Sequence, residues 1–275
     1  MSGRLTRFVE GERASTVTLG VGWRRSGDAL VCRVDTLQEV TGGDLISGKA
    51  PHSRSWSRRE LLVLCVLTGI MAATFVVLTA DVWHANRQVA LDRVAAEVGI
   101  VPGEEGPLGG DRRRAEAAGH LGSRRGVGLA TLALVGLAMF WREWVTALVA
   151  LLAPLVCFVI IEYVGKPAIN EPIPFGGRAY PSGHGAGVTA VAVSGLVLLY
   201  RRWGGPVAIL FAPVAVAAVT TGGLGVLALG LHHYPTDVVG GAVLASTVVL
   251  SLTVVLSWAT DILLTSGRLN IGERP

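Results

Sequence analysis

The chain has 275 residues, of which 51% are hydrophobic and only 6% aromatic, and its formal net charge is +4. Its apolar mass is mostly Ala, Val, Leu and Gly, a balance that favours packed membrane helices over a soluble core. The charges are spread over loops and tails, and no basic run is interleaved with aromatic residues, which excludes an ordinary nucleic-acid surface.

The three cysteines indicate neither a disulfide framework nor a thiolate metal site. Cys65 and Cys157 lie within apolar stretches and Cys32 lies in a polar region, so no zinc-ligand spacing can be drawn. We expect no metal and no cofactor.

Residues 1–58 are polar, with Gly, Ser and Arg throughout and no long apolar run, so we expect no cleavable secretory signal there. We interpret this segment as a cytoplasmic tail. The weak alternation of 16–34 allows a small hairpin, and a disordered tail explains it equally well.

The segment 61–80 is uncharged and, at about 1.5 Å per residue, just long enough to cross the roughly 30 Å hydrocarbon layer. Five further uncharged runs follow, at 126–141, 144–161, 185–200, 203–231 and 238–260. The sequence therefore predicts an all-α integral membrane protein whose six transmembrane helices form one domain, 59–262.

Arginines in the short connections indicate which ends of the helices face the cytoplasm. Arg142 separates the second and third runs, and Arg201 and Arg202 separate the fourth and fifth; short basic loops stay inside. The third-to-fourth and fifth-to-sixth connections then face outward, with a long extracytoplasmic loop at 84–125 and a short cytoplasmic tail at 263–275. We expect a multi-pass protein of the plasma (inner) membrane.

The outward connection before the fourth run ends in the sequence YPSGH at 180–184. The opening turn of a helix has unpaired amides and the positive end of the dipole, so Ser182 and Gly183 could hold phosphate oxygens there. His184 would stand beside a leaving oxygen and act as an acid. In the competing interpretation, Ser182 only caps the helix and His184 only faces interfacial water.

The sixth run opens with the sequence HHYPTD, which ends at Asp237 and contains Pro235, a residue suited to a first helical turn. His233 precedes Asp237 by four residues, and in a helical turn this spacing brings the carboxylate to the imidazole. The carboxylate can accept one ring N–H and leave the other nitrogen free to attack. His232 is the rival nucleophile, but its partner at the same spacing is Thr236. In the competing interpretation, the histidines are passive and Asp237 only caps the helix.

Two cations flank the Gly-rich loop between the third and fourth runs, Lys166 and Arg178, and cations there could clamp phosphate. Lysine is rare in this chain: among its 24 Lys and Arg residues, only Lys49 and Lys166 are lysines. In the competing interpretation, both side chains only snorkel to the interface.

The YPSGH motif at 180–184, followed by HYPTDVVGG at 233–241, resembles the signature of the type 2 phosphatidic acid phosphatase superfamily. The resemblance covers about 60–260 and leaves 1–58 outside it. It implies the helical core that this superfamily shares with vanadium haloperoxidases and, as in its membrane-bound members, six spans with an outward-facing site.

The resemblance also implies roles for individual residues. His233 would be the nucleophile, Asp237 its partner and His184 the general acid, while Ser182 and Gly183 would hold phosphate without any metal.

The chain departs from the family's pattern at two clamp positions. Lys166 matches the lysine of the first motif, but Ile173 stands where the family has Arg, and Leu227 stands where the third motif has an Arg six residues before the nucleophile. A bidentate guanidinium contact to phosphate is therefore missing. Arg178 is the best-placed candidate to replace it.

We expect a metal-independent lipid phosphatase that hydrolyses a phosphomonoester or diphosphate through a phosphohistidine intermediate. Polyprenyl phosphate or diphosphate, phosphatidate and phosphatidylglycerol phosphate all fit, and the sequence selects neither a headgroup nor an oligomeric state. The alternative is a weak or inactive membrane protein that binds lipid phosphate. A haloperoxidase-like oxidation enzyme is a third hypothesis, although such enzymes are generally soluble and hold vanadate with a full set of cations.

Overall fold

The computed structural model describes residues 4–5, 16–26, 29–40, 56–85, 89–97, 112–169, 179–228 and 233–269. The chain divides into two compact units, Met1–His52 and Ser53–Pro275.

The first unit contains an antiparallel sheet with strand order β1-β2-β3. Its strands are β1 (Arg4–Leu5), β2 (Thr16–Ser26) and β3 (Ala29–Val40). Strands β2 and β3 pair from Ser26 with Ala29 to Thr16 with Val40. The hairpin that the alternation of 16–34 allowed is therefore present, and it extends to Val40.

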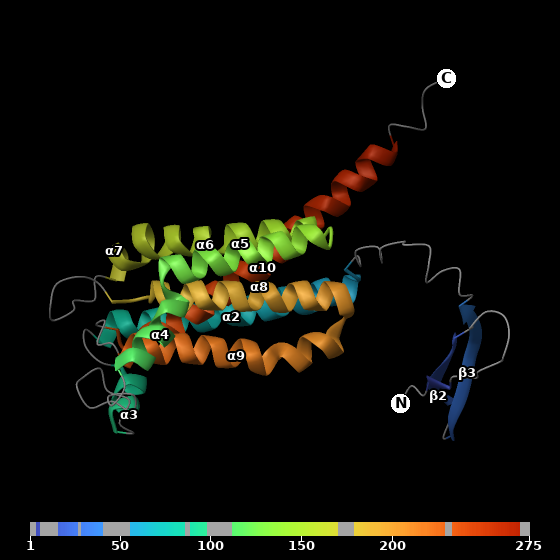
Figure 1. The fold of residues 1–275 in the computed structure, drawn as a ribbon, viewed down its shortest axis with the longest axis horizontal. Coiled ribbons are helices and arrows are strands. Elements are labelled where there is room, and N and C mark those ends of the chain that lie inside the picture. Colours follow the sequence, from blue (N-terminus) through green and yellow to red (C-terminus); the bar gives the residue numbers. More distant parts are fainter. Residues whose placement is uncertain are drawn as a thin grey trace. The chain divides into compact units, whose positions relative to one another are not determined.

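The second unit is helical. Its elements are α2 (Arg58–Ala85), α3 (Ala90–Glu97), α4 (Arg112–Gly122), α5 (Arg124–Phe140), α6 (Trp144–Val159), the π-helical segment η1 (Ile160–Gly165), α7 (Lys166–Ile169), α8 (Gly183–Trp203), α9 (Gly205–Ala228) and α10 (Pro235–Leu269). Figure 1 shows the long helices running side by side.

Five helical stretches are long and apolar enough to cross a membrane, namely α2, α6 with η1 and α7, α8, α9 and α10. The sixth predicted span, 126–141, corresponds to α5, which reaches the same length only together with α4, across a bend of 56°. The structure thus supports a multi-pass helical membrane protein with five or six spans.

The segment 84–125, which we expected to be a long loop, contains two helices. Helix α4 packs against α9 and α8, and a Cβ added to Gly225 of α9 would overlap the amide nitrogen of Gly119 in α4. The sequence did not reveal this because α4 is rich in Arg and Ala and has no apolar run long enough to stand out. The long connection predicted at 84–125 therefore contains the helices α3 and α4.

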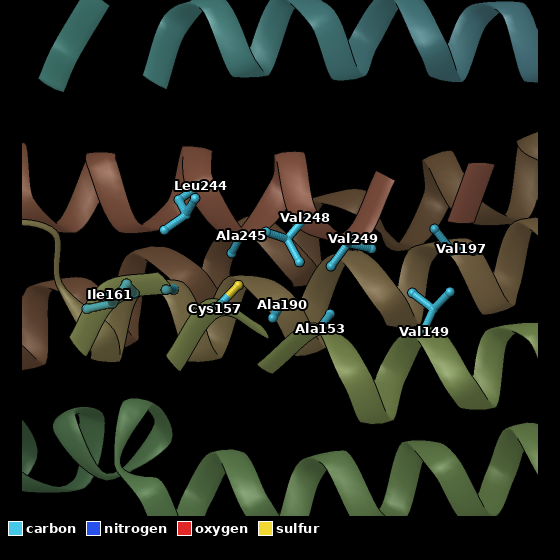
Figure 2. Close-up of a cluster of buried hydrophobic side chains, with 11 residues drawn as sticks. Val149, Ala153, Cys157, Ile161, Ala190, Val197, Leu244, Ala245, Val248 and Val249 are labelled. Carbon is cyan, nitrogen blue, oxygen red and sulfur yellow. The ribbon is translucent and has the colours of Figure 1, made fainter. Parts of the chain in front are cut away.

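The largest buried cluster lies where α6, α8 and α10 meet (Figure 2). Its members are mainly small or β-branched, which lets membrane helices approach closely and interdigitate. They are Val149, Ala153, Cys157, Ile161, Ala186, Ala190, Val197, Leu244, Ala245, Val248 and Val249. This packing fixes α8 and α10, the two helices that carry the sequence motifs, against the same partner.

A buried ion pair joins two short connections at one end of the bundle. The Nε of Arg201, near the end of α8, donates to Oε2 of Glu143, just before α6, over 2.7 Å. Trp56, ahead of α2, stacks on Tyr200 with ring centroids 5.1 Å apart. The connections that carry Arg142 and Arg201 therefore share one end of the bundle with the start of α2.

We expect Arg201→Ala to lower stability by about 3 kcal/mol or more, because it leaves the Glu143 carboxylate buried without its counter-ion. Thermal unfolding in detergent measures the effect. The control is Arg142→Ala, at the exposed position next to Glu143. The double variant Glu143→Leu/Arg201→Leu should regain much of the lost stability. Equal melting temperatures for Arg201→Ala and Arg142→Ala would contradict a stabilising pair.

Candidate functional site

The first turns of α8 and α10 meet at the opposite end of the bundle, where α4 and α7 also lie (Figure 1). The amide of Ser182 donates to the carbonyl oxygen of Asp237 over 2.9 Å. A Cβ added to Gly241 would overlap the carbonyl oxygen of Ser182, and one added to Gly185 would lie 2.9 Å from that of Val238. Glycine at both positions therefore permits the contact that brings the two motifs together.

Helix α8 begins as the YPSGH motif predicted. Ser182 is its N-cap, with extended backbone, and its Oγ accepts from the amide of Gly185 over 3.4 Å. The Ser182 side chain is buried, whereas Gly183 is exposed and His184 is half-buried in the following turn. Capping by Ser182 is thus present, and its contact with phosphate stays a prediction.

Helix α10 begins at Pro235, as expected, so His233 lies just ahead of the helix. Oδ2 of Asp237 accepts from the amide of Tyr234 over 2.7 Å and lies 3.3 Å from Nδ1 of His233. The pair forms through an N-terminal capping turn, and not within a turn of helix as we had reasoned. Asp237 is fully buried, and its Oδ1 has no hydrogen-bond partner among the described residues.

A second buried carboxylate, Asp92 of α3, fixes the start of α10 from another side. Its Oδ1 accepts from both the amide and the hydroxyl of Thr236, with the amide contact at 3.0 Å, and its Oδ2 accepts from the amide of Val89 over 3.2 Å. The negative charge lies at the positive end of the α10 dipole. Sequence reasoning missed Asp92 because α3 falls inside the supposed loop.

His184 and His233 line one cavity of about 520 Å³. Its charged lining comes from Arg124 at the start of α5, Glu162 in η1 and Lys166 at the start of α7. The size is ordinary for a small-molecule site. Within the described part of the chain, no three His, Cys, Asp or Glu side chains are grouped so as to hold a metal ion.

Lys166 lines this cavity, as its predicted role requires, but it does so with a partner. Its Nζ donates to Oε1 of Glu162 over 2.7 Å. The single π-helical turn η1, a feature that often occurs at functional sites, carries Glu162 and ends just before Lys166. Part of the lysine's positive charge is therefore compensated inside the cavity.

Arg124 is a cavity residue that sequence reasoning assigned to the long loop. It is the first residue of α5, after the N-cap Ser123, and its guanidinium carbon lies 5.6 Å from the centre of the Phe158 ring of α6. The available signal was a serine just ahead of an apolar run, which marks a helix start. Arg178, the expected substitute for the missing clamp, lies outside the described residues, as do Ile173 and His232.

The cavity combines features suited to binding an anion. Two cations and two imidazoles line it, against one lining carboxylate, Glu162. The unpaired amides of the first turn of α8 add the positive end of a helix dipole beside His184. An anion with several oxygens would thus meet donors from three elements at once.

No family model, curated protein or solved structure matches the chain. The arrangement of the cavity and the two short motifs therefore carry the functional argument by themselves.

We expect Gly241→Ala to destabilise the protein by about 1–3 kcal/mol, because the new methyl group would overlap the Ser182 carbonyl and force α8 from α10. Gly195→Ala in α8 is the matched control, since a Cβ there meets nothing within 4 Å and alanine favours a helix by about 0.5–1 kcal/mol. Thermal unfolding of both variants in detergent measures the difference. If Gly241→Ala melted at or above the Gly195→Ala temperature, the close contact would be refuted.

Proposed function

We propose that the protein is a metal-independent lipid phosphatase of the type 2 phosphatidic acid phosphatase kind. The observation that carries the proposal is that His184 and the Asp237-paired His233 line one cavity with Arg124 and Lys166. General acid and nucleophile must both reach one phosphorus centre, and the cations must reach its oxygens.

The chemistry follows from which nitrogen of His233 is engaged. Asp237 faces Nδ1, so it holds the proton there and leaves the Nε2 lone pair free to attack phosphorus. As the N–P bond forms, the P–O bond to the lipid breaks and the leaving oxygen takes a proton from His184. The products of this step are a lipid alcohol and phosphohistidine.

The second step regenerates the imidazole. His184, now neutral, takes a proton from water while the water oxygen attacks phosphorus, and the N–P bond breaks to release inorganic phosphate. With a lipid diphosphate, the same steps release the lipid monophosphate in the first step.

Arg124 takes the place of the missing clamp arginine in this proposal. It contributes a planar, permanently charged fork that can contact two phosphate oxygens. Lys166 adds a second cation and Gly183 the amide of the first turn of α8, while Ser182 holds that turn by capping. Arg178 stays a further candidate for the same role.

The substrate is a lipid because the cavity lies between α6 and α8, which are long and apolar enough to span a membrane, and α5, which is so together with α4. We place the protein in the plasma membrane with the cavity on the outer face, because the arginine-bearing connections lie together at the other end of the bundle. Phosphate would then be approached from the headgroup layer.

Two observations favour the alternative, a protein that binds lipid phosphate without turning it over. Leu227, at the position where the family has Arg, is buried in α9, and the charge of Lys166 is shared with Glu162. A weaker clamp stabilises the transition state less than a full one. A turnover measurement separates the two functions directly.

We expect the protein purified in detergent to release phosphate from a diacylglycerol phosphate or a polyprenyl phosphate, and His233→Ala to abolish release. His184→Ala should lower kcat by roughly 10²- to 10⁴-fold, the usual contribution of a general acid. His120→Ala, at an exposed position on α4 outside the cavity lining, is the matched control. Vanadate, which mimics the pentacoordinate phosphorus, should inhibit.

The outcomes of this assay separate the alternatives. Lipid phosphate that binds but yields no phosphate would establish the binding protein. Release that persists in His233→Ala would remove His233 as nucleophile and would direct attention to His232.

We expect Arg124→Ala to lower kcat/KM for a lipid phosphate by roughly 10²- to 10³-fold, the usual cost of losing one preorganised donor. Arg125→Ala removes the same charge from the next position, which is exposed and does not line the cavity, and should leave kcat/KM nearly unchanged. Equal effects of the two substitutions would mean that only overall charge matters. A large loss of kcat/KM in Arg178→Ala with none in Arg124→Ala would show that Arg178, and not Arg124, contacts the phosphate.

A further inference from the structure

The cavity that holds the two histidines continues as an apolar groove between α5 and α6. Below Arg124, its α5 wall consists of Val127, Gly128, Thr131 and Leu132, and its α6 wall of Leu151, Pro154, Leu155 and Phe158. One continuous space therefore joins a charged mouth to a hydrocarbon-like interior.

The groove is about as deep as one leaflet. From Arg124 to Leu132 the α5 wall spans eight residues, or about 12 Å of helix, against roughly 15 Å for half of a 30 Å hydrocarbon layer. Leu132 and Leu155 are 64% and 56% exposed, so the lower groove opens sideways between the helices. A chain could enter it from the membrane without leaving an apolar medium.

A glycine lines the groove close to its charged mouth. Gly128 lies one turn below Arg124, and a Cβ added to it would meet no atom within 4 Å. On the opposite wall Pro154 lies inside α6, which continues through it. The charge at the mouth and the apolar walls below match a molecule with a phosphate at one end and a hydrocarbon chain at the other.

We propose that the α5–α6 groove binds the hydrocarbon chain attached to the phosphate that His233 attacks. The inference rests on the proposed function in placing the phosphate at the histidines, and it assigns the chain to one particular helix pair. The groove then selects substrates by the shape of the first part of their chain, while Arg124 holds the phosphate directly above it.

The test separates chain binding from catalysis by comparing two substrates, a long-chain alkyl phosphate and the chain-free ester para-nitrophenyl phosphate. Gly128→Leu should lower kcat/KM for the long-chain substrate about tenfold or more, a typical effect of steric misfit in an apolar pocket. It should leave hydrolysis of the chain-free ester within about twofold of the wild-type rate.

Matched variants exclude a general loss of folding. Gly136→Leu places the same side chain two turns further along α5, where a Cβ also meets nothing within 4 Å, and it should behave like the wild type on both substrates. A second pair repeats the comparison: Leu132→Trp lies in the groove, whereas Leu129→Trp, at a 70% exposed position, does not. Equal losses within each pair would overturn the assignment.

A photolabelling experiment measures chain binding without depending on turnover. A long-chain alkyl phosphate with a diazirine in mid-chain should label peptides of α5 and α6, and excess unlabelled alkyl phosphate, but not the corresponding alcohol, should suppress the label. Gly128→Leu should weaken this labelling and Gly136→Leu should not. Labelling of α2 and α9 as strong as that of α5 and α6, or labelling that Gly128→Leu leaves unchanged, would overturn the assignment of the chain to the α5–α6 groove. Groove labelling without phosphate release from any substrate would refute catalysis alone.

Discussion

The contact between the first turns of α8 and α10 is the constraint on which the site depends. A hydrogen bond from the Ser182 amide to the Asp237 carbonyl joins two segments that are far apart in the sequence. Gly185 and Gly241 permit it, because any side chain there would overlap the facing backbone. The same turns carry His184 and the Asp237-paired His233, so the packing that joins the helices also sets the spacing of the histidines.

Neighbouring helices contact this junction from several sides. Helix α6 packs against both α8 and α10 through small and β-branched side chains, and buried Asp92 fixes the α10 start from α3. Helix α4 lies close to His184, since a Cβ added to Gly122 would come within 2.9 Å of the His184 Cβ. Parts of the connection 84–125 thus line the cavity, and Arg124 at the start of α5 lines it as well.

The elements that could be predicted from sequence are those whose signal is local. Uncharged runs marked the long helices, Pro235 and Ser182 marked the starts of α10 and α8, and the spacing of His233 and Asp237 marked their pairing. Short polar helices such as α3 and α4 have no such run, so 84–125 was predicted as a loop. The roles of Asp92, Glu162 and Arg124 depend on contacts with segments that are distant in the sequence. The spacing of residues along the chain does not predict such contacts.

The sequence by itself determined that the chain contains long apolar helices and that two histidine motifs open two of them, because hydrophobic run length and helix-start chemistry are properties of neighbouring residues. Only the tertiary structure decided that the motifs meet, that Lys166 is paired with Glu162, and that Arg124 and the α5–α6 groove join the histidines in one cavity. Those outcomes depend on which helices pack together and at what distance. That is set by small residues at the crossings, whose effect appears only when both helices are present.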